Sequence, residues 1–259
     1  MPDPGGLPAG SIDDAIARMD RIIARCAETG DARGWFAVVY RAVTARVRDG
    51  IAAGAFDDGE RMEAFDVRFA THWLDAYDAW DRARPVSASW ACSFEAAARP
   101  GVILQHLLLG MNAHINLDLG LAAAQTCPGP GVVELRDDFE RINDVLGELV
   151  DAMQAAISEV SPMARVLDVV GLRLDEAIVS FSLAQARARS WRFAEELATA
   201  DLAPALVDAR DAAVAGYGAR LARPGFAMRC LLPIARWREE PDLARVAGLL
   251  RARGAEVQL

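Results

Sequence analysis

The stretch that decides the fold is GVILQHLLLGMNAHINLDLGLAAAQ, residues 101–125. Leucine, isoleucine and alanine dominate it, and it carries two of the three histidines of the chain. Polar side chains interrupt this run where a buried helix would normally have aliphatic ones: Gln105, His106, Asn112, His114, Asn116 and Asp118. Burying such groups costs free energy unless each finds a partner. The stretch is therefore expected to hold either an internal polar network or a functional site.

One face of this predicted helix carries the side chains best suited to bind an ion or to transfer a proton. At about 100° per residue, His106 and His114 lie roughly 80° apart around the axis, and Asp118 lies about 40° beyond His114. His114 and Asp118 are four residues apart, a spacing at which two side chains can bind one ion or a carboxylate can hold an imidazole in one tautomer. Gly110 on the same face leaves room for a ligand or for a close helix.

Asn112 and Asn116 form a second pair at a spacing of four residues, on another side of the helix. Such a pair is typical of contacts between helices as well as of chemistry. A helix with polar pairs on two sides needs neighbours on both, as the central helix of a bundle has. We therefore expect residues 101–125 to lie at the centre of the molecule.

Helical spacing and helix-ending signals recur along the rest of the chain. Ser11 is a predicted N-cap with Asp14 three residues later, and Gly30 ends that helix. Asp57 and Asp58 begin a helix with a stripe of aromatic side chains that is typical of a core: Phe65, Phe69, Trp73 and Trp80. Prolines and glycines in CPGPG, residues 127–131, break the helical pattern again.

The second half of the chain continues in the same way. After Leu135 a helical period resumes until Pro162, and further helices are predicted over residues 174–198, 204–222, 226–237 and 242–252, the last ending at Gly254. No segment alternates as a strand does. We expect an all-α fold, a single multi-helix bundle of about nine or ten helices around the central polar-interrupted helix, with residues 1–10 a flexible leader and 11–259 one domain.

Composition restricts the partners. The formal charge of −9 and the pI near 4.9 argue against a nucleic-acid partner and against an anionic membrane surface, which both need clustered positive charge. The beginning of the chain has no pattern of a secretory signal, and no apolar run is as long and uncharged as a membrane span. The four cysteines form no C-x-x-C pair. We expect a cytoplasmic protein with reduced thiols and a small-molecule substrate, and the oligomeric state stays open.

Several kinds of chemistry are excluded by missing residues. All 28 basic side chains are arginine, so no lysine can form a Schiff base or act in a P-loop. The chain has no E-x-x-H, no H-E-x-x-H and no G-x-S-x-G, so the patterns of ferritin-like di-iron proteins, common metalloproteases and α/β-hydrolases are absent.

A metal site is the leading hypothesis for the central helix. His106, His114 and Asp118 supply at most three ligands, whereas a metal centre needs about four. The helix that follows CPGPG begins with several carboxylates, of which Asp138 and Asp144 are the candidates to complete the site. Nitrogen and carboxylate ligands suit zinc first, with iron or manganese as alternatives. His72, beside the aromatic stripe, fits a satisfied interior or boundary histidine better than a ligand.

The leading functional prediction is a metal-dependent hydrolase or lyase that acts on a small molecule. His106, His114, Asp118, Asp138 and Asp144 would hold the ion, and the catalytic residues would be His114, Asp118 and Asp138. Two alternatives remain open. One is a non-catalytic binding or scaffold bundle with a structural network of buried polar groups. The other is a metal-free lyase or isomerase in which Asp118 orients His114 as the general base.

The run LQHLLLGMNAHINLDL, followed by DFERINDVL and later by SWRFAEELA, resembles an uncharacterised bacterial domain family of unknown function. The resemblance covers about residues 30–225, and QHLLLGMNAHIN is its most specific part. It implies an all-α domain and draws attention to His106, His114, Asn116, Asp118 and Asp138. It implies no activity, and His72 is not part of the pattern.

Overall fold

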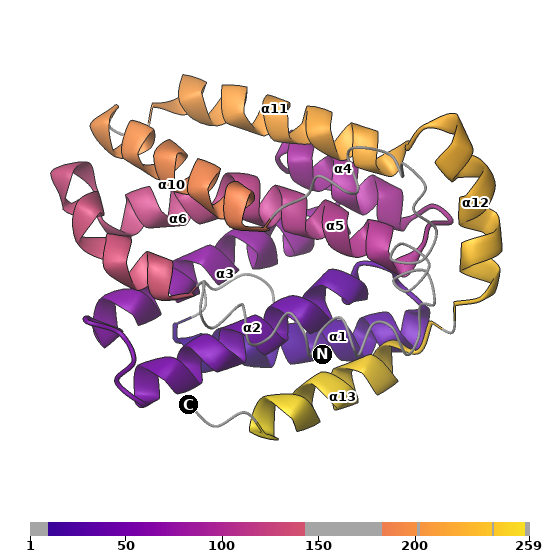
Figure 1. The fold of residues 1–259 in the computed structure, drawn as a ribbon, viewed down its shortest axis with the longest axis horizontal. Coiled ribbons are helices and arrows are strands. Elements are labelled where there is room, and N and C mark those ends of the chain that lie inside the picture. Colours follow the sequence, from indigo (N-terminus) through magenta and orange to yellow (C-terminus); the bar gives the residue numbers. More distant parts are fainter. Residues whose placement is uncertain (1–9, 143–182, 201–202, 240, 257–259) are drawn as a thin grey trace.

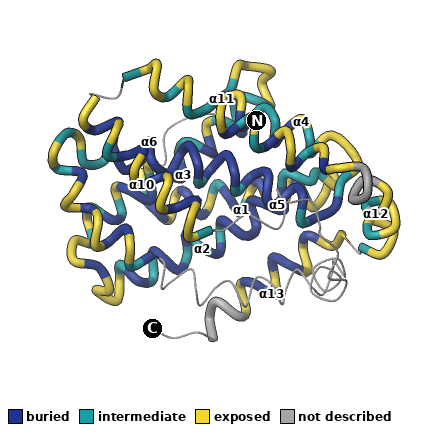
Figure 2. The backbone as a smooth tube through the Cα atoms, turned by 45° about the horizontal axis from the view of Figure 1, so that its top comes forward, coloured by how far each residue is buried: buried dark blue, intermediate teal, exposed yellow. Residues whose placement is uncertain are grey.

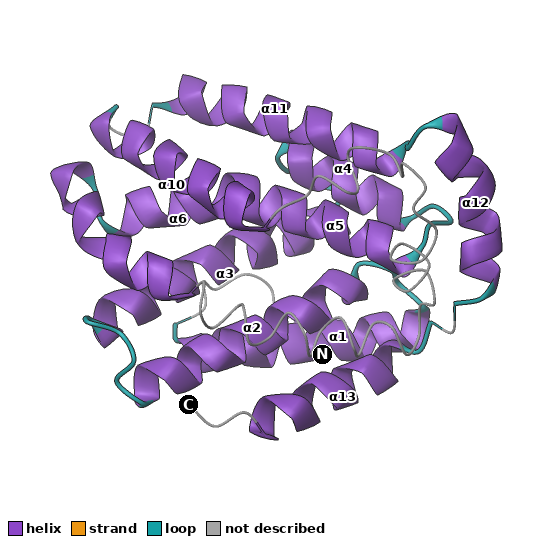
Figure 3. Ribbon diagram, in the orientation of Figure 1, coloured by secondary structure: helices purple, strands orange, loops and turns teal. Residues whose placement is uncertain are grey.

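The chain folds into helices alone wherever the computed structural model describes it, over residues 10–142, 183–200, 203–239 and 241–256. Figure 3 shows this plainly, and it confirms the all-α prediction. The elements before the first gap are α1 (Ile12–Thr29), α2 (Gly34–Ala52), α3 (Gly59–Asp81), α4 (Ala88–Ala97), α5 (Ile103–Ala113), a π-helical turn (His114–Asp118), α6 (Leu119–Thr126) and a 3₁₀ helix (Gly129–Leu135). After it come α10 (Leu183–Thr199), α11 (Pro204–Ala222), α12 (Phe226–Trp237) and α13 (Leu243–Glu256).

Side chains that cap helix ends explain where several helices begin and end. Ser11 accepts a hydrogen bond from the backbone N–H of Asp14, so the predicted N-cap is confirmed. Asp58 accepts one from the N–H of Arg61 and caps α3, the helix predicted to begin at Asp57 and Asp58. Gly30 ends α1 in the left-handed conformation, with φ of 69°, which costs a glycine little. These local signals mark where the helices begin and end.

The centre of the molecule is the helix that runs without a break from Ile103 to Thr126 through α5, the π-helical turn and α6. It is long and apolar enough to cross a membrane by length and composition, unlike the sequence-based expectation, yet 89% of its most apolar window is buried inside the protein. Figure 2 shows α5 and α6 almost entirely in the colour of buried residues. The helix is therefore the core element of this fold.

The other helices surround this central helix (Figure 1). Helices α2 and α3 pack against it from one side, whereas α10 packs on α6, and α11 lies across α4 and α5. Helix α13 packs on α1 and α2, so the end of the chain returns to its beginning. The predicted aromatic stripe of α3 forms part of the core, since Phe65, Phe69 and Trp73 are buried.

The predicted helix bounds of the second half agree with the structure where it describes the chain. Helices α11 and α12 have the predicted limits, and α10 covers the later part of the predicted helix 174–198. Helix α13 continues through Gly254 to Glu256, so the predicted end at that glycine is wrong. Residues 1–9 of the predicted leader and residues 143–161 of the helix predicted after Leu135 lie outside the described residues.

Candidate functional site

The side chains of His114 and Asp118 bind each other at the centre of the molecule. His114 Nδ1 lies 3.0 Å from Asp118 Oδ2, and the two residues are 2% and 3% exposed. The sequence left open whether this pair would share an ion or hold one tautomer. The direct contact between nitrogen and oxygen favours the role in which Asp118 holds the imidazole in one tautomer. This contact orients the ring and leaves Nε2 as the nitrogen that can meet a ligand.

The pair lies in the π-helical turn that interrupts the central helix. The N–H of Leu119 bonds to the carbonyl of His114, five residues back instead of four. In this wider turn, side chains four residues apart lie more nearly in line along the axis than in an α-helix, which favours their contact. π-helical turns occur often at functional sites. The α-helical period of 3.6 residues does not apply to a π-helical turn, so the spacing of residues in the sequence does not reveal it.

Trp90 of α4 fixes the position of the Asp118 carboxylate. Its indole Nε1–H donates a hydrogen bond of 2.9 Å to Asp118 Oδ2, the oxygen that also contacts His114. Burial raises the pKa of Asp118 well above its usual range, and the Trp90 hydrogen bond opposes this by stabilising the charged form. Burial also lowers the pKa of His114 well below its usual range. Both pKa shifts favour the neutral form of each side chain.

Aromatic rings enclose the imidazole of His114. The ring of Phe69 is stacked on it, with 3.7 Å between centroids and 8° between planes. Tyr40 meets it edge to face at 4.2 Å, and Phe36 does so at 5.3 Å. These rings come from α2 and α3, two consecutive helices that enclose the imidazole of the central helix. The ring therefore has little freedom to rotate away from Asp118.

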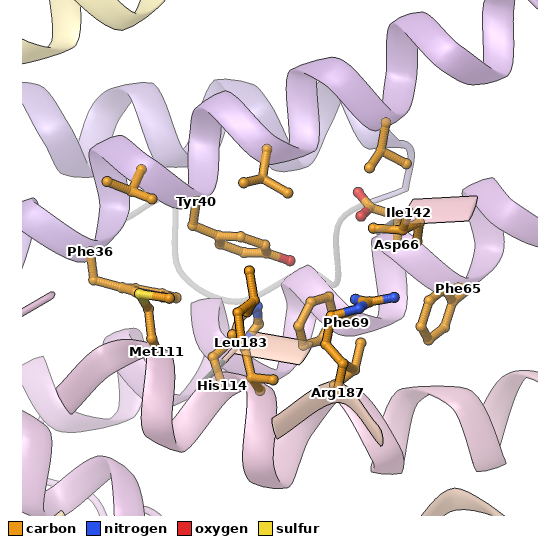
Figure 4. A pocket seen from close by; sticks show the side chains of 15 residues that line it. Phe36, Tyr40, Phe65, Asp66, Phe69, Met111, His114, Ile142, Leu183 and Arg187 are labelled. Atoms are coloured by element: carbon orange, nitrogen blue, oxygen red, sulfur yellow. The ribbon is translucent and has the colours of Figure 1, made fainter. Parts of the chain in front are cut away.

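A cavity of about 70 Å³ lies beside His114, and we call it the His114 cavity. Figure 4 shows the side chains around it, which come from α2, α3, the central helix and α10, together with Ile142 after the 3₁₀ helix. Most of them are apolar, and the polar ones besides His114 are Tyr40, Asp66 and Arg187. A space of this size holds a few water molecules or a molecule of a few non-hydrogen atoms.

Three buried polar atoms of residues around this cavity have no hydrogen-bond partner among the residues that the structure describes: His114 Nε2, Tyr40 Oη and Asp66 Oδ2. Thr44 lies close enough to act on the pKa of Tyr40, but neither hydroxyl makes a hydrogen bond of normal geometry. Leaving a buried polar atom unpaired costs about 1–3 kcal/mol. A bound molecule with donor and acceptor groups would remove this cost at several atoms together.

Burial also tunes the other titratable groups of the cavity. It raises the pKa of Asp66 to about 7, so near neutral pH this carboxyl is present in both protonation states. Burial, followed by the charge of Asp66, raises the pKa of Tyr40, which stays a neutral hydroxyl. Burial lowers the pKa of Arg187 to about 10, so it remains a cation, and its guanidinium donates to the carbonyl of Phe139. The cavity thus combines an exchangeable proton with a fixed positive charge.

His106, the other predicted ligand of the central helix, lies away from His114. Eight residues separate the two, a rise of about 12 Å along a helix, and His106 lines a different cavity near Gly101 and α12. Burial and then the charge of Arg236 lower the pKa of His106 to about 4, so its ring is neutral. The shared face predicted from periodicity does not bring the two imidazoles together.

Asp138 binds the loop between α2 and α3 instead of the central helix. Its carboxylate accepts hydrogen bonds from the backbone N–H groups of Asp57 and Asp58, at 2.8 and 3.2 Å, and from the side chains of Arg61 and Arg141. These donors hold the pKa of Asp138 below its usual value against the effect of burial. Its observed contacts are those of a structural anchor.

The remaining predicted ligands give no metal cluster in the described part of the chain. Asp144 lies outside the described residues. Among the residues that the structure describes, no three His, Cys, Asp or Glu side chains gather as a metal would need. His72 Nε2 lies 2.9 Å from Gln125 Oε1, as expected for a satisfied boundary histidine. The zinc, iron or manganese site stays a prediction.

The other polar side of the central helix binds α11. Asn112 donates to the carbonyl of Val214 at 3.0 Å, and Asn116 donates to Asn112 Oδ1 at 3.1 Å. Gln105 donates to the carbonyls of Leu221 and Ala222 at the end of α11. Asn112 and Gln105 thus connect the central helix to α11, one of the two roles that the sequence left open for the asparagine pair, whereas the side chain of Asn116 binds Asn112 within the central helix.

Sequence reasoning missed four residues around His114: Tyr40, Asp66, Trp90 and Arg187. A signal existed for Asp66, because it lies four residues after Met62 and three before Phe69, on the buried face of α3. A carboxylate at a core position indicates either a partner or a site. Tyr40 likewise follows Phe36 by one helical turn. Trp90 and Arg187 join the site only through tertiary contacts.

Comparison with known proteins places the chain in a family. The model of the Family of unknown function (DUF5995) matches residues 12–224, most of the chain, so the protein belongs to this family. No curated protein and no solved structure matches it significantly. The matched range contains the central helix and every residue named above around the His114 cavity, and it ends before α12.

Proposed function

We propose that this member of a family of unknown function is an enzyme that binds a small molecule in the His114 cavity and moves a proton at His114 Nε2. One observation supports the proposal: His114 Nε2 and Asp66 Oδ2 are both buried and have no hydrogen-bond partner in the described part of the chain, and their side chains line one cavity from different helices. Pairs of titratable groups with pKa values moved in opposite directions are typical of acid–base sites.

The contact with Asp118 defines what Nε2 can do. When Asp118 is ionised, it accepts from Nδ1–H, and Nε2 presents a lone pair that can take a proton. When Asp118 is protonated, it donates to Nδ1, and Nε2 carries a hydrogen that it can give. The pair can therefore act as base and then as acid, with Asp118 as a positioning residue that stabilises the imidazolium formed in between.

A proton transfer from carbon also needs a group that stabilises the charge left on the substrate, and other side chains of the cavity supply it. When a carbonyl compound with an acidic C–H bond loses its proton to Nε2, the electron pair of that bond moves onto the carbonyl oxygen. Asp66 in its protonated form and the Tyr40 hydroxyl are the donors available to this oxygen, and the Arg187 charge favours it. The arrangement suits an isomerase or a lyase acting on a small carbonyl compound.

Hydrogen exchange with solvent tests this proposal without knowledge of the natural substrate. Acetone and butanone are incubated with the protein in D₂O, and deuterium incorporation at carbon is followed by NMR. We expect exchange faster than in buffer alone, loss of this exchange in His114→Gln, and at least a tenfold reduction in Asp66→Asn. His72→Gln, a histidine outside the cavity, is the matched control and should exchange as the native protein does.

Two outcomes would overturn the proposal. One is exchange by the native protein no faster than in buffer, and the other is exchange that persists in a folded His114→Gln variant. Circular dichroism of each variant separates loss of chemistry from loss of fold.

The metal-dependent enzyme predicted from the sequence is tested by the same protein. Metal content is measured on protein purified without a metal-affinity tag, and the exchange assay is repeated with a chelator. Exchange that resists the chelator supports the metal-free mechanism. A stoichiometric ion whose removal stops the exchange supports the metal-dependent hydrolase or lyase instead.

A further inference from the structure

A second and larger cavity lies where the C-terminal helices meet the rest of the protein. It measures about 780 Å³, within the range of small-molecule sites, and we call it the C-terminal cavity. Its walls include Trp35, Pro100, His106, Arg236, Trp237 and Glu239. Helix α12, which lies at one end of the molecule in Figure 1, forms one wall, and the starts of α2 and α5 form the other.

Aromatic side chains line this cavity in an unusual way. Trp35 is buried in its floor, whereas Trp237 is 82% exposed although it is one of the largest apolar side chains of the protein. An indole left in water at the edge of a cavity offers a flat face on which a planar ring can stack. Both tryptophans therefore favour a ligand with an aromatic ring.

The charges around the cavity favour an anionic group on that ligand. Arg236 is exposed, lines the cavity and forms no ion pair within the described ranges of the chain. Arg99, also in the lining, has only a 3.8 Å contact with Glu95 between two exposed side chains. The one acidic group in the lining, Glu239, has both carboxylate oxygens 3.2 Å from the backbone nitrogen of Ile103 at the start of α5. Its charge is thus directed at the helix end.

His106 adds an unused hydrogen-bond acceptor. Its ring is 8% exposed and lines the cavity, and its Nδ1 has no hydrogen-bond partner within the described ranges. The other ring nitrogen, Nε2, lies beside Gly101, whose backbone favours a proton on the ring, and a proton on Nε2 leaves the lone pair on Nδ1. An N–H or O–H group of a ligand would satisfy it.

We infer that the C-terminal cavity binds a small planar aromatic anion, with its ring against Trp237, its negative group beside Arg236 and a donor group at His106 Nδ1. This site is separate from the His114 cavity, because no residue lines both. Helix α12 and Pro241 belong to the segment that follows the family match, so this site combines the family domain with a part of the chain beyond it.

Two fluorescent probes with the same ring system test this inference. Anilinonaphthalene sulfonate carries a sulfonate and an aryl N–H, whereas phenylnaphthylamine lacks the sulfonate. We expect saturable binding of the sulfonate probe at one site per chain, weakened about tenfold by Arg236→Gln and by Trp237→Ala. Arg236→Gln should leave binding of the neutral probe unchanged, because only the anion meets the guanidinium.

Control variants on the same helix make the result specific. Arg238→Gln and Ile234→Ala change exposed side chains that do not line the cavity, and both should bind the sulfonate probe as the native protein does. His114→Gln should also bind normally, since the His114 cavity is too small for either probe. Absence of saturable binding, or equal weakening by Arg236→Gln and Arg238→Gln, would overturn the inference.

Discussion

Gly110 and Phe36 meet so closely that a Cβ atom on Gly110 would lie 2.6 Å from Phe36 Cγ. The missing side chain lets the central helix approach α2, and it places the Phe36 ring against the imidazole of His114. Of the two uses that the sequence allowed for this glycine, room for a ligand or for a close helix, the structure shows the close helix. The lack of a side chain at Gly110 therefore helps to determine the shape of the His114 site.

Gly110→Ala should destabilise the protein by about 1–3 kcal/mol, because the added methyl group would push Phe36 out of a packed core. Gly216 is the matched control, since it lies in α11 with no atom within 4 Å of an added Cβ. Gly216→Ala should stabilise the protein by about 0.5–1 kcal/mol, the usual gain from replacing an exposed helical glycine. Urea unfolding of both variants measures the difference, and equal effects would contradict this account of Gly110.

Asp66→Asn should raise stability at pH 8 and leave it nearly unchanged at pH 4. Burial raises the folded-state pKa from 3.8 to about 7, so below about pH 4 the carboxyl is protonated in both the folded and the unfolded state. As pH rises from about 4 to 7, Asp66 loses its proton more readily in the unfolded chain than in the folded protein. The free energy of unfolding of the native protein therefore falls. Asparagine, which does not titrate, avoids this loss of a few kcal/mol.

Thermal or urea unfolding at several pH values tests the effect of Asp66→Asn. Glu60→Gln, a change of an exposed carboxylate on the same helix, serves as the control and should not show this dependence. A difference between Asp66→Asn and the native protein that does not grow with pH would show that the Asp66 carboxyl is not buried as described.

Trp90→Phe should cost about 1–3 kcal/mol, because it removes the N–H donor of a buried carboxylate while keeping most of the ring. It should also raise the pKa of Asp118 further, since the hydrogen bond from Trp90 opposes the rise that burial causes. NMR of the His114 imidazole should register the altered contact at Nδ1. Trp237→Phe, at an exposed position, should change neither the stability nor the His114 signal.

Asp138→Asn should destabilise the protein by about 1–3 kcal/mol above pH 5, because an amide group cannot accept from all the donors that surround this carboxylate. The folded-state pKa of Asp138 is lowered, so its contribution is present above the unfolded value of 3.8 and is lost as pH falls through the folded value. Asp137→Asn, at the exposed neighbouring position, is the control for unfolding measurements. Equal stability of the two variants would contradict the anchoring role.

Much of the fold could be predicted from the sequence because its signals are local. Ser11, Asp58 and Gly30 act within one helical turn of their own positions, and the aromatic stripe of α3 is visible in its spacing. The pairing of His114 with Asp118 is equally local. Pro204 at the start of α11 and Pro224 and Gly225 between α11 and α12 are local signals of the same kind.

The rest of the site depends on contacts between residues that are far apart in the chain. Asp138 binds a loop about eighty residues earlier, as its sequence separations of 81 and 80 from Asp57 and Asp58 show. No periodicity contains that information, so the sequence alone cannot show that the Asp138 carboxylate binds this loop. The position of Asp66 beside His114 likewise requires the arrangement of α3 against the central helix.

The π-helical turn can also be understood as one extra residue inside an otherwise regular helix. Removing a residue such as Ile115 would let α5 and α6 join as a single α-helix. Four residues at about 100° each turn the chain by nearly the same angle as five residues at the smaller rotation of a π-helical turn, so α5 and α6 would keep the faces that meet α11 and α10. The deletion would change the turn itself, where His114 and Asp118 would then be three residues apart instead of four. The extra residue therefore acts on the contact between His114 and Asp118 and leaves the packing of the neighbouring helices almost unaffected.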